Sequence, residues 1–117
     1  MAAKNRGELL RAYAAAKPGA FDDHPWEDDL VYKVGGKIFV FFGSAGRLPV
    51  AITVSCGPDA AEWRARYPGS ISVARYIGRH GWNTVLVDDA VPVDELRELI
   101  DLSYARVVAG LPKSKRP

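Results

Sequence analysis

Hydrophobic residues recur at helical spacing close to the N-terminus of the chain. The repeating positions are Leu9, Leu10, Tyr13 and Ala14. This spacing predicts an amphipathic helix. Asn5 is its expected N-cap, and Glu8 three residues later fits a variant of the capping box. Pro18-Gly19 should end the helix.

The longest helical pattern lies near the C-terminus. Pro92 should begin this helix, with Asp94 and Glu95 in the first turn, at the positive end of the helix dipole. One face carries Val93, Leu96, Leu99, Ile100, Ser103 and Val107. Gly110 and Pro112 should stop it, which leaves the residues KSKRP as a frayed tail.

A third, shorter helix is expected in the middle of the chain. It opens at Gly57-Pro58, where proline is tolerated in the first helical turn. Asp59 and Glu62 suit its N-terminal end, and Tyr67-Pro68-Gly69 should terminate it.

Five segments show the pattern of β-strands, namely residues 30–34, 37–42, 48–55, 71–75 and 83–88. In the third of them, apolar residues alternate with small or polar ones, which is typical of a strand with one buried face. Gly35-Gly36 separates the first two strands and predicts a type I′ hairpin turn. Residues 20–29 are expected to form an acidic loop, residues 43–47 a hairpin loop, and Asp88-Asp89 a turn.

The resulting order is α-β-β-β-α-β-β-α, and we expect an α+β fold. Short connections between strands predict an antiparallel five-stranded sheet, and the long helices should cover one of its faces as a two-layer α/β sandwich. With 117 residues, the chain suits one domain, expected over residues 1–112 and followed by a basic tail at 113–117.

The composition narrows the class of protein. Hydrophobic residues make up 48% and charged residues 26%, as in ordinary globular proteins. There is neither an apolar run long enough to cross a membrane nor a signal-peptide pattern, so a cytoplasmic protein without a membrane partner is expected. Cys56 is the only cysteine, which excludes an intrachain disulfide and favours a small buried residue over a nucleophile.

Charge is unevenly distributed along the chain, although the net charge is only +2. Residues 21–30 hold five acids and no Lys or Arg, and residues 83–100 hold five acids against one Arg. The segment between them is rich in arginine, and the C-terminal tail adds Lys113, Lys115 and Arg116. Such a polarised surface could steer an anionic partner.

No segment carries a complete catalytic or metal-binding pattern. The serines lack a nucleophile elbow, and GSAG at residues 43–46 does not lead from a strand into a helix, as a phosphate-cradling loop would. The acidic loop around His24 matches no calcium-loop template. We therefore expect no cofactor, no metal and no enzymatic activity; the remaining enzyme hypothesis is a small-ligand or catalytic site at His24 or His80.

The stretch RYIGRHGWN, residues 75–83, concentrates basic and aromatic residues and allows two interpretations. Arg75, Arg79 and His80, with Tyr76 and Trp82, have the composition of a nucleic-acid contact, through phosphate neutralisation and base stacking. Alternatively, the aromatic residues pack in the core. In that case the two glycines form a tight turn and the asparagine satisfies local backbone groups.

Five segments together resemble the MmcQ/YjbR family over nearly the whole chain. They are AKPGAFDDHPW, YKVGGKIFVFF, CGPDAAEWRARYPGS, RYIGRHGWNTVLVD and DLSYARVVAGLPK. The resemblance implies an α-β(3)-α-β(2)-α fold of the secretion-chaperone-like kind, also described as CyaY-like. It further implies a small cytosolic protein of a group often described as DNA-binding, without agreed catalytic residues. This chain departs from the family pattern at Ser55, where relatives usually have lysine.

These observations lead to a hypothesis of DNA binding through phosphate contacts, with little sequence specificity. The residues proposed to contact the nucleic acid are Lys37, Arg75, Arg79, His80, Trp82, Lys113, Lys115 and Arg116.

The alternative is a protein- or peptide-binding adaptor, or a module that forms homodimers. This hypothesis requires an exposed apolar sheet face lined by Phe39, Phe41, Val50 or Ile52. The sequence does not decide between a monomer and a homodimer.

Overall fold

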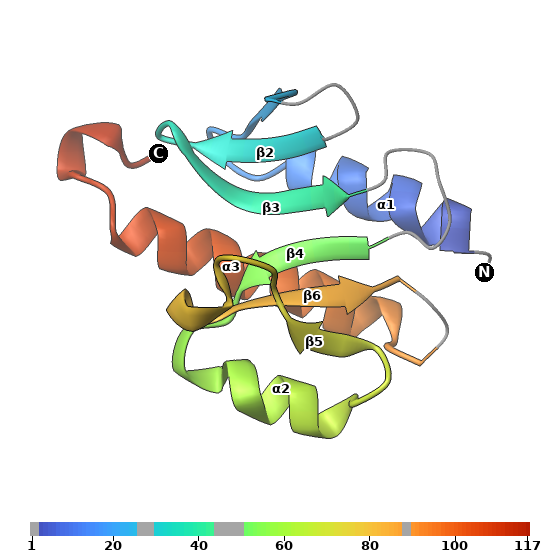
Figure 1. Cartoon of the computed structure of the whole chain (residues 1–117). Coiled ribbons are helices and arrows are strands. Elements are labelled where there is room, and N and C mark those ends of the chain that lie inside the picture. The colour runs from blue at the N-terminus through green and yellow to red at the C-terminus, as the bar shows by residue number, and fades with distance from the viewer. Residues whose placement is uncertain (1–2, 26–29, 44–50, 88–89) are drawn as a thin grey trace.

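A computed structural model describes residues 3–25, 30–43, 51–87 and 90–117 (Figure 1). Its elements, in chain order, are α1 (Ala3–Ala15), β1 (Phe21–Asp23), β2 (Leu30–Val34), β3 (Lys37–Gly43), β4 (Ala51–Ser55), the 3₁₀ turn η1 (Gly57–Asp59), α2 (Ala60–Arg66), β5 (Ile71–Val73), the 3₁₀ turn η2 (Gly78–His80), β6 (Trp82–Leu86), α3 (Val93–Ala109) and the 3₁₀ turn η3 (Lys113–Lys115).

The described strands form one antiparallel sheet in the order β1-β2-β3-β4-β6-β5. The α+β class and the antiparallel arrangement are confirmed, but the sheet has six strands, so the expectation of five was wrong. The additional strand is β1, which lies within the expected acidic loop and pairs Asp22 with Tyr32. Three residues at a sheet edge, two of them acidic, are too short to show period-two alternation.

The β2–β3 hairpin follows the sequence prediction closely. Gly35 and Gly36 both have positive φ, at 59° and 82°, as a type I′ turn requires. The pairing of β2 with β3 contains one irregularity, because Tyr32 lies opposite Val40 whereas its neighbour Lys33 lies opposite Ile38. Phe39 is the extra residue of this β-bulge. Both Phe39 and Val40 are consequently buried.

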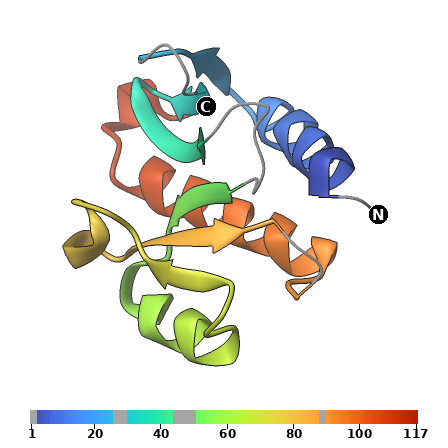
Figure 2. The same cartoon turned by 45° about the vertical axis from the view of Figure 1, so that its right-hand side comes forward.

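Helix α3 covers the central strands of the sheet and packs on β3 and β4 (Figures 1 and 2). Its fully buried residues are Leu96, Leu99, Ile100 and Ser103. The apolar residues facing it include Val40, Phe42, Ile52, Val54 and Val85, all at most 1% exposed. The apolar residues that repeat every 3.6 positions in the helix therefore pack against those that repeat every second position in the strands, and together they form one core.

Ser103 connects α3 to the point where β3 and β4 separate. Ladder pairing between these strands ends at Val40 and Val54, and Figure 1 shows them diverging beyond it. The Ser103 hydroxyl donates to the Phe39 carbonyl at 2.5 Å and accepts from the Ser55 N–H at 2.8 Å. One buried hydroxyl thus satisfies two backbone groups that lie beyond the last ladder pair.

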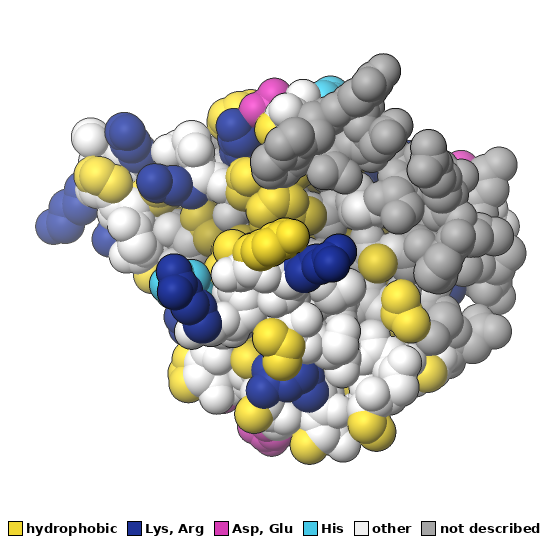
Figure 3. Space-filling model, viewed as in Figure 1, with side chains coloured by type: hydrophobic (Ala, Val, Ile, Leu, Met, Phe, Trp, Pro, Cys, Tyr) yellow, Lys and Arg dark blue, Asp and Glu magenta, His cyan; other side chains and the backbone are white. Residues whose placement is uncertain are grey.

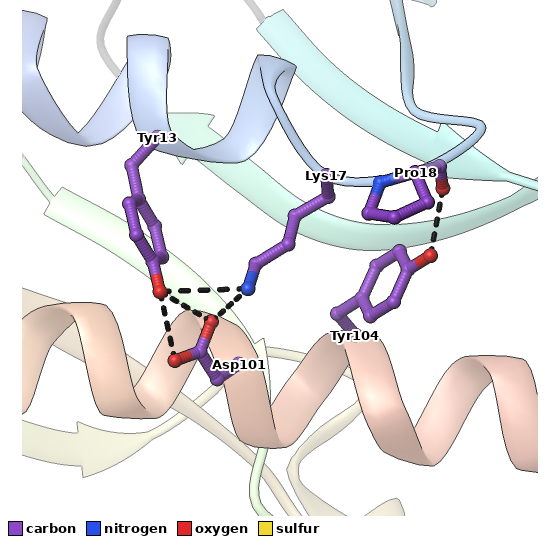
Figure 4. A network of polar contacts seen from close by, with 5 residues as sticks. All are labelled: Tyr13, Lys17, Pro18, Asp101 and Tyr104. Atoms are coloured by element: carbon purple, nitrogen blue, oxygen red, sulfur yellow. Dashed lines mark hydrogen bonds and ion pairs between the residues drawn. The ribbon is translucent and has the colours of Figure 1, made fainter.

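Helix α1 is joined to α3 by a polar network (Figure 4). The Tyr13 hydroxyl donates to Asp101 at 2.7 and 2.8 Å, and the Lys17 ammonium forms an ion pair with the same carboxylate. Lys17 also lies over the rings of Tyr13 and Tyr104, 4.7 and 5.7 Å from their centroids. The Tyr104 hydroxyl donates to the Pro18 carbonyl at 2.7 Å. These contacts fix the end of α1 against the middle of α3.

The chain ends differ from the sequence predictions. Helix α1 begins at Ala3, so Asn5 lies inside it and does not cap it; Ala3 and Lys4 are good helix formers that extend the helix. The C-terminal residues form η3 instead of a frayed tail. Arg116 donates to the carbonyls of Leu111 and Ala109 at 3.0 and 3.1 Å, which folds the tail back onto the end of α3.

Ser103→Ala should lower the free energy of unfolding by about 2–3 kcal/mol, because it leaves two buried backbone groups unsatisfied. Chemical denaturation of the variant and of Ser72→Ala, which removes an exposed serine from β5, measures the effect. The control should change stability by less than about 0.5 kcal/mol. Equal, small effects of both substitutions would contradict the role given to Ser103.

Asp101→Asn should flatten the alkaline dependence of stability. The hydrogen bond to Asp101, aided by burial, raises the pKa of Tyr13. Burial by itself would lower the pKa of Lys17, but hydrogen bonds to Asp101 and Tyr13 raise it. Both groups hold their protons more tightly when folded, so their stabilisation is complete below about pH 10 and is lost as the pH rises further.

The test compares urea unfolding at about pH 9 and about pH 11, where the wild type should lose more stability than Asp101→Asn. Asp94→Asn removes the same charge from a carboxylate that is 94% exposed and should keep the wild-type slope. An identical slope in all three proteins would exclude the network as its source.

Cys56 should react with thiol reagents only when the protein unfolds. It is 0% exposed, and burial raises its pKa to about 11. Only about 0.1% of such a thiol is ionised at about pH 8, and the thiolate is the reactive form. Labelling should therefore be slow in buffer and fast in denaturant. Rapid labelling of the native protein would contradict this prediction.

Candidate nucleic-acid interface

The loop between β5 and β6 carries most of the predicted site residues, and its base is held by backbone hydrogen bonds. Ala74 N–H donates to the Trp82 carbonyl at 3.1 Å, and Gly78 N–H donates to the Ala74 carbonyl at 3.0 Å. Cys56 N–H donates to the Gly81 carbonyl at 2.8 Å, which ties the loop to the end of β4. The loop is therefore a fixed platform that joins two strands.

The basic side chains of this loop point into solvent. Arg75, Arg79 and His80 are all exposed. Arg79 Nε donates to His80 Nε2 at 3.3 Å, so these two side chains are neighbours. The Arg75 guanidinium lies 5.8 Å from the ring centroid of Tyr76. The structure thus groups three of the predicted contact residues on one short segment.

Trp82 lies half-buried at the start of β6 and has a packing partner. Its ring meets that of Phe41 edge to face, with centroids 5.7 Å apart. Asn83, the next residue, is 0% exposed and donates to the Ala60 carbonyl at 3.0 Å. Arg64 in turn donates to the Asn83 side-chain oxygen at 2.9 Å. Both residues fit the structural interpretation of the stretch RHGWN.

A close glycine contact forms the corner behind the loop. Gly81 has φ 84°, and a Cβ on it would lie 2.7 Å from the Gly57 Cα. Gly57 has φ 56°, and a Cβ there would meet the Arg106 guanidinium carbon at 2.1 Å. Only glycine fits either position. Arg106 Nε also donates to Ser55 Oγ at 3.3 Å, so α3 adds a cation next to this corner.

Arg106 is a basic residue of this region that no sequence pattern indicated as a contact residue. It lies in the last turn of α3, a helix that was predicted from its apolar face. A basic residue is common at that end of a helix, so its charge gave no sign of a binding site. Only the fold brings it beside Gly57 and the neighbouring loop. Ser55 accepts its hydrogen bond.

Lys37 and the basic tail residues lie around the β2–β3 turn, apart from the β5–β6 loop in sequence. A Cβ on Gly35 would lie 2.5 Å from Leu111 and 3.0 Å from the Lys115 carbonyl, so the tail passes directly beside this turn. Lys37 is exposed two residues farther on, and Lys113 is exposed at the start of η3. Figure 1 places the turn, η3 and η2 towards the same end of the molecule.

Ion pairs with carboxylates involve several other cations of the molecule. In the described parts of the chain, the ion pairs of Lys or Arg join Lys17 to Asp101, Lys33 to Asp23, Arg66 to Glu62 and Glu95, and Arg97 to Asp94. No ion pair with a described carboxylate involves Lys37, Arg75, Arg79, Arg106, Lys113, Lys115 or Arg116. We call these seven residues the unpaired cations; Arg11 and Arg64 also have no ion pair with a described carboxylate, but they lie in other parts of the fold, and Arg64 donates to the Asn83 side chain.

The space-filling view agrees with this separation. Figure 3 looks onto the sheet face opposite α3 and shows basic side chains around a central hydrophobic patch and along the end that carries η2 and η3. The acidic side chains visible there lie at the margins of the view. On the face seen in this view, the end that carries η2 and η3 shows basic side chains and no acidic one, and it therefore offers positive charge to an anion.

The apolar face required by an adaptor is mostly covered. Phe39 and Ile52 are 0% exposed, within the core beneath α3, so the expectation that they line an open face was wrong. Phe41 is half-buried against Trp82, and Val50 lies outside the described residues. Across the open face, the hydroxyl oxygens of Thr53 and Thr84 lie 3.2 Å apart. That face is thus mixed in polarity.

The remaining candidates for chemistry are dispersed. His24 Nε2 lies 3.6 Å from Asp22 in an exposed ion pair, far from His80 along the sheet order. Over residues 3–25, 30–43, 51–87 and 90–117, no three His, Cys, Asp or Glu side chains gather in a way that could hold a metal ion. Within the same ranges, no helix is both long and apolar enough to cross a membrane.

Solved structures share this fold. A crystal structure of a Deinococcus radiodurans protein with a DUF419 domain superimposes with a TM-score of 0.84 at 26% identity, covering 92% of this chain and 83% of that one. A crystal structure of a Pseudomonas syringae protein gives a TM-score of 0.67 at 22% identity, covering 82% of this chain and 93% of that one. The second likeness supports the fold alone.

Proteins with similar sequences show the family of this chain. The uncharacterized protein YjbR of Escherichia coli strain K12 is 30% identical over 111 residues, which cover 93% of this chain and 92% of the relative. The protein of the same name from Escherichia coli O157:H7 matches equally well. The sequence model of the YjbR family matches residues 15–106. The chain therefore belongs to the YjbR family.

Proposed function

We propose that this protein binds nucleic acid through the phosphate backbone, using the end of the molecule that carries η2, η3 and the β2–β3 turn. The observation that carries the proposal is the segregation of its cations. Lys17, Lys33, Arg66 and Arg97 are neutralised by carboxylates elsewhere in the molecule, whereas the seven unpaired cations gather at this end. A cytoplasmic location, where nucleic acid is abundant, completes the proposal.

Electrostatics sets the strength of such binding. Each neutralised phosphate releases counterions, so affinity falls steeply with salt. With about four to six phosphate contacts, the affinity should drop by at least about a hundredfold between about 50 and about 200 mM salt. The net charge of only +2 makes the arrangement of the cations, and not their total, the source of attraction.

Low sequence specificity follows from where the cations lie. They come from a loop, a hairpin turn, the end of a helix and a tail, and none belongs to a helix that could enter the major groove with several side chains. Helix α3 has its apolar face buried against the sheet. Contacts of this kind position a backbone without reading base edges.

A binding protein without catalytic activity is part of the same proposal. The buried thiol of Cys56 remains protonated near neutral pH, since burial raises its pKa to about 11. His80 has a neighbouring arginine and no described acid in hydrogen-bond contact. Cys56 and His80 therefore do not form the combination of nucleophile, base and orienting acid that covalent catalysis needs.

The double substitution Arg75→Ala/Arg79→Ala should weaken binding to a short DNA at low salt by at least about tenfold. It should also reduce the slope of log affinity against log salt by about 2, because two phosphate contacts are lost. Fluorescence anisotropy in a salt series measures both quantities.

The matched control is Lys33→Ala/Arg66→Ala, which removes the same charge from cations paired with Asp23, Glu62 and Glu95. Its salt slope should stay at the wild-type value. If the wild type fails to bind DNA at low salt, or if both double variants lose the same affinity, the proposed phosphate-binding function is wrong.

A further inference from the structure

Tyr76 combines two features that the folding of the chain does not require. Its side chain is 87% exposed, although tyrosine has a large apolar ring that usually packs. Its φ is +67°, and within the described ranges it is the only residue other than glycine with a positive φ. This backbone region is unfavourable for residues with a bulky side chain.

The hydrogen bonds around Tyr76 explain how the loop holds this conformation. Ile77 N–H donates to the Arg75 carbonyl at 2.8 Å, a bond between residues two positions apart. Together with the positive φ of Tyr76, this is the pattern of the γ-turn that is rare and strained. A second bond from Gly78 N–H to the Ala74 carbonyl encloses it. The loop is therefore built to hold one aromatic side chain outward.

The surroundings of the ring have the chemistry of a nucleotide site. Arg75 lies over the ring, 5.8 Å from its centroid, and Arg79 and His80 follow within four residues. A flat aromatic surface beside cations that lack carboxylate partners is the combination used to hold nucleotides, with stacking for the base and positive charge for the phosphate. Strained and exposed residues of this kind concentrate at functional sites.

We propose that Tyr76 is a stacking platform for an unpaired base, so that the preferred ligand of the basic end is single-stranded nucleic acid. This inference rests on the phosphate-binding function proposed above and gives it a substrate class. Bases inside a duplex have both faces covered by their neighbours, so an exposed ring gains a stacking partner only where a base is unpaired.

The substitution Tyr76→Gly tests the platform without endangering the fold, because glycine adopts positive φ readily and the lost ring is in solvent. We expect its thermal stability to equal or exceed that of the wild type. Its affinity for a short oligothymidine strand should fall by about 5- to 100-fold, the effect of removing one stacking contact. Its affinity for a blunt duplex of the same length and the salt slope on both ligands should stay unchanged.

Two further variants test whether the Tyr76 ring itself contacts the base. Tyr76→Trp should retain the affinity for the single strand and show fluorescence quenching when the oligothymidine binds, as a ring in contact with a base would. Phe21→Ala removes another exposed aromatic side chain, 47% exposed on β1, and should leave both affinities unchanged.

The outcomes distinguish the two proposals. If the wild type binds both ligands with salt dependence and Tyr76→Gly binds both equally well, phosphate binding stands and the stacking platform is overturned. An equal loss on single strand and duplex overturns it as well. If the wild type binds neither ligand at low salt, the phosphate-binding function itself fails.

Discussion

The separation of β3 from β4 is the constraint on which the rest of the fold depends. Beyond Val40 and Val54 the two strands stop pairing, and the Ser103 hydroxyl bonds to a backbone group of each one. Because Ser103 belongs to α3, the same contact fixes the helix over the centre of the sheet. The β-bulge at Phe39 supports this arrangement. It places the Phe39 carbonyl within reach of the Ser103 hydroxyl. The Phe39 ring lies 5.3 Å from the Tyr104 ring, edge to face.

The proposed binding end follows from the same divergence. Past Ser55 the chain turns at Gly57, where Gly81 and Arg106 approach closely. The corner joins the β5–β6 loop to the end of β4 and brings the last turn of α3 alongside. The tail then folds back on the β2–β3 turn. Four segments that are distant in sequence thus bring their cations to one end, while Lys17, Lys33, Arg66 and Arg97 are paired with carboxylates elsewhere.

Strain and charge are combined on the β5–β6 loop. A tyrosine with positive φ costs about 1 kcal/mol or more, and its exposed ring returns little by packing. The bonds at the base of the loop, among them Ala74 N–H to the Trp82 carbonyl, hold the strained conformation in place. The stability of the core and the conformation of the loop are therefore separable, which allows Tyr76 to be replaced without loss of the fold.

Local patterns determined most of the elements. Helix α3 and the alternating strand that contains Ile52 and Val54 lie where their periodicity predicts, because each pattern repeats long enough to be recognised. The β2–β3 hairpin turns where Gly35-Gly36 predicts it. The three residues of β1, two of them acidic, show no such repeat, and this strand is recognised only by its pairing with the edge of β2. The basic stretch at residues 75–80 is visible in the sequence. The ion pairs of other cations with carboxylates, the approach of Arg106 to the loop and the positive φ of Tyr76 are not. Those properties arise from contacts between segments far apart in the chain, which only the tertiary structure decides.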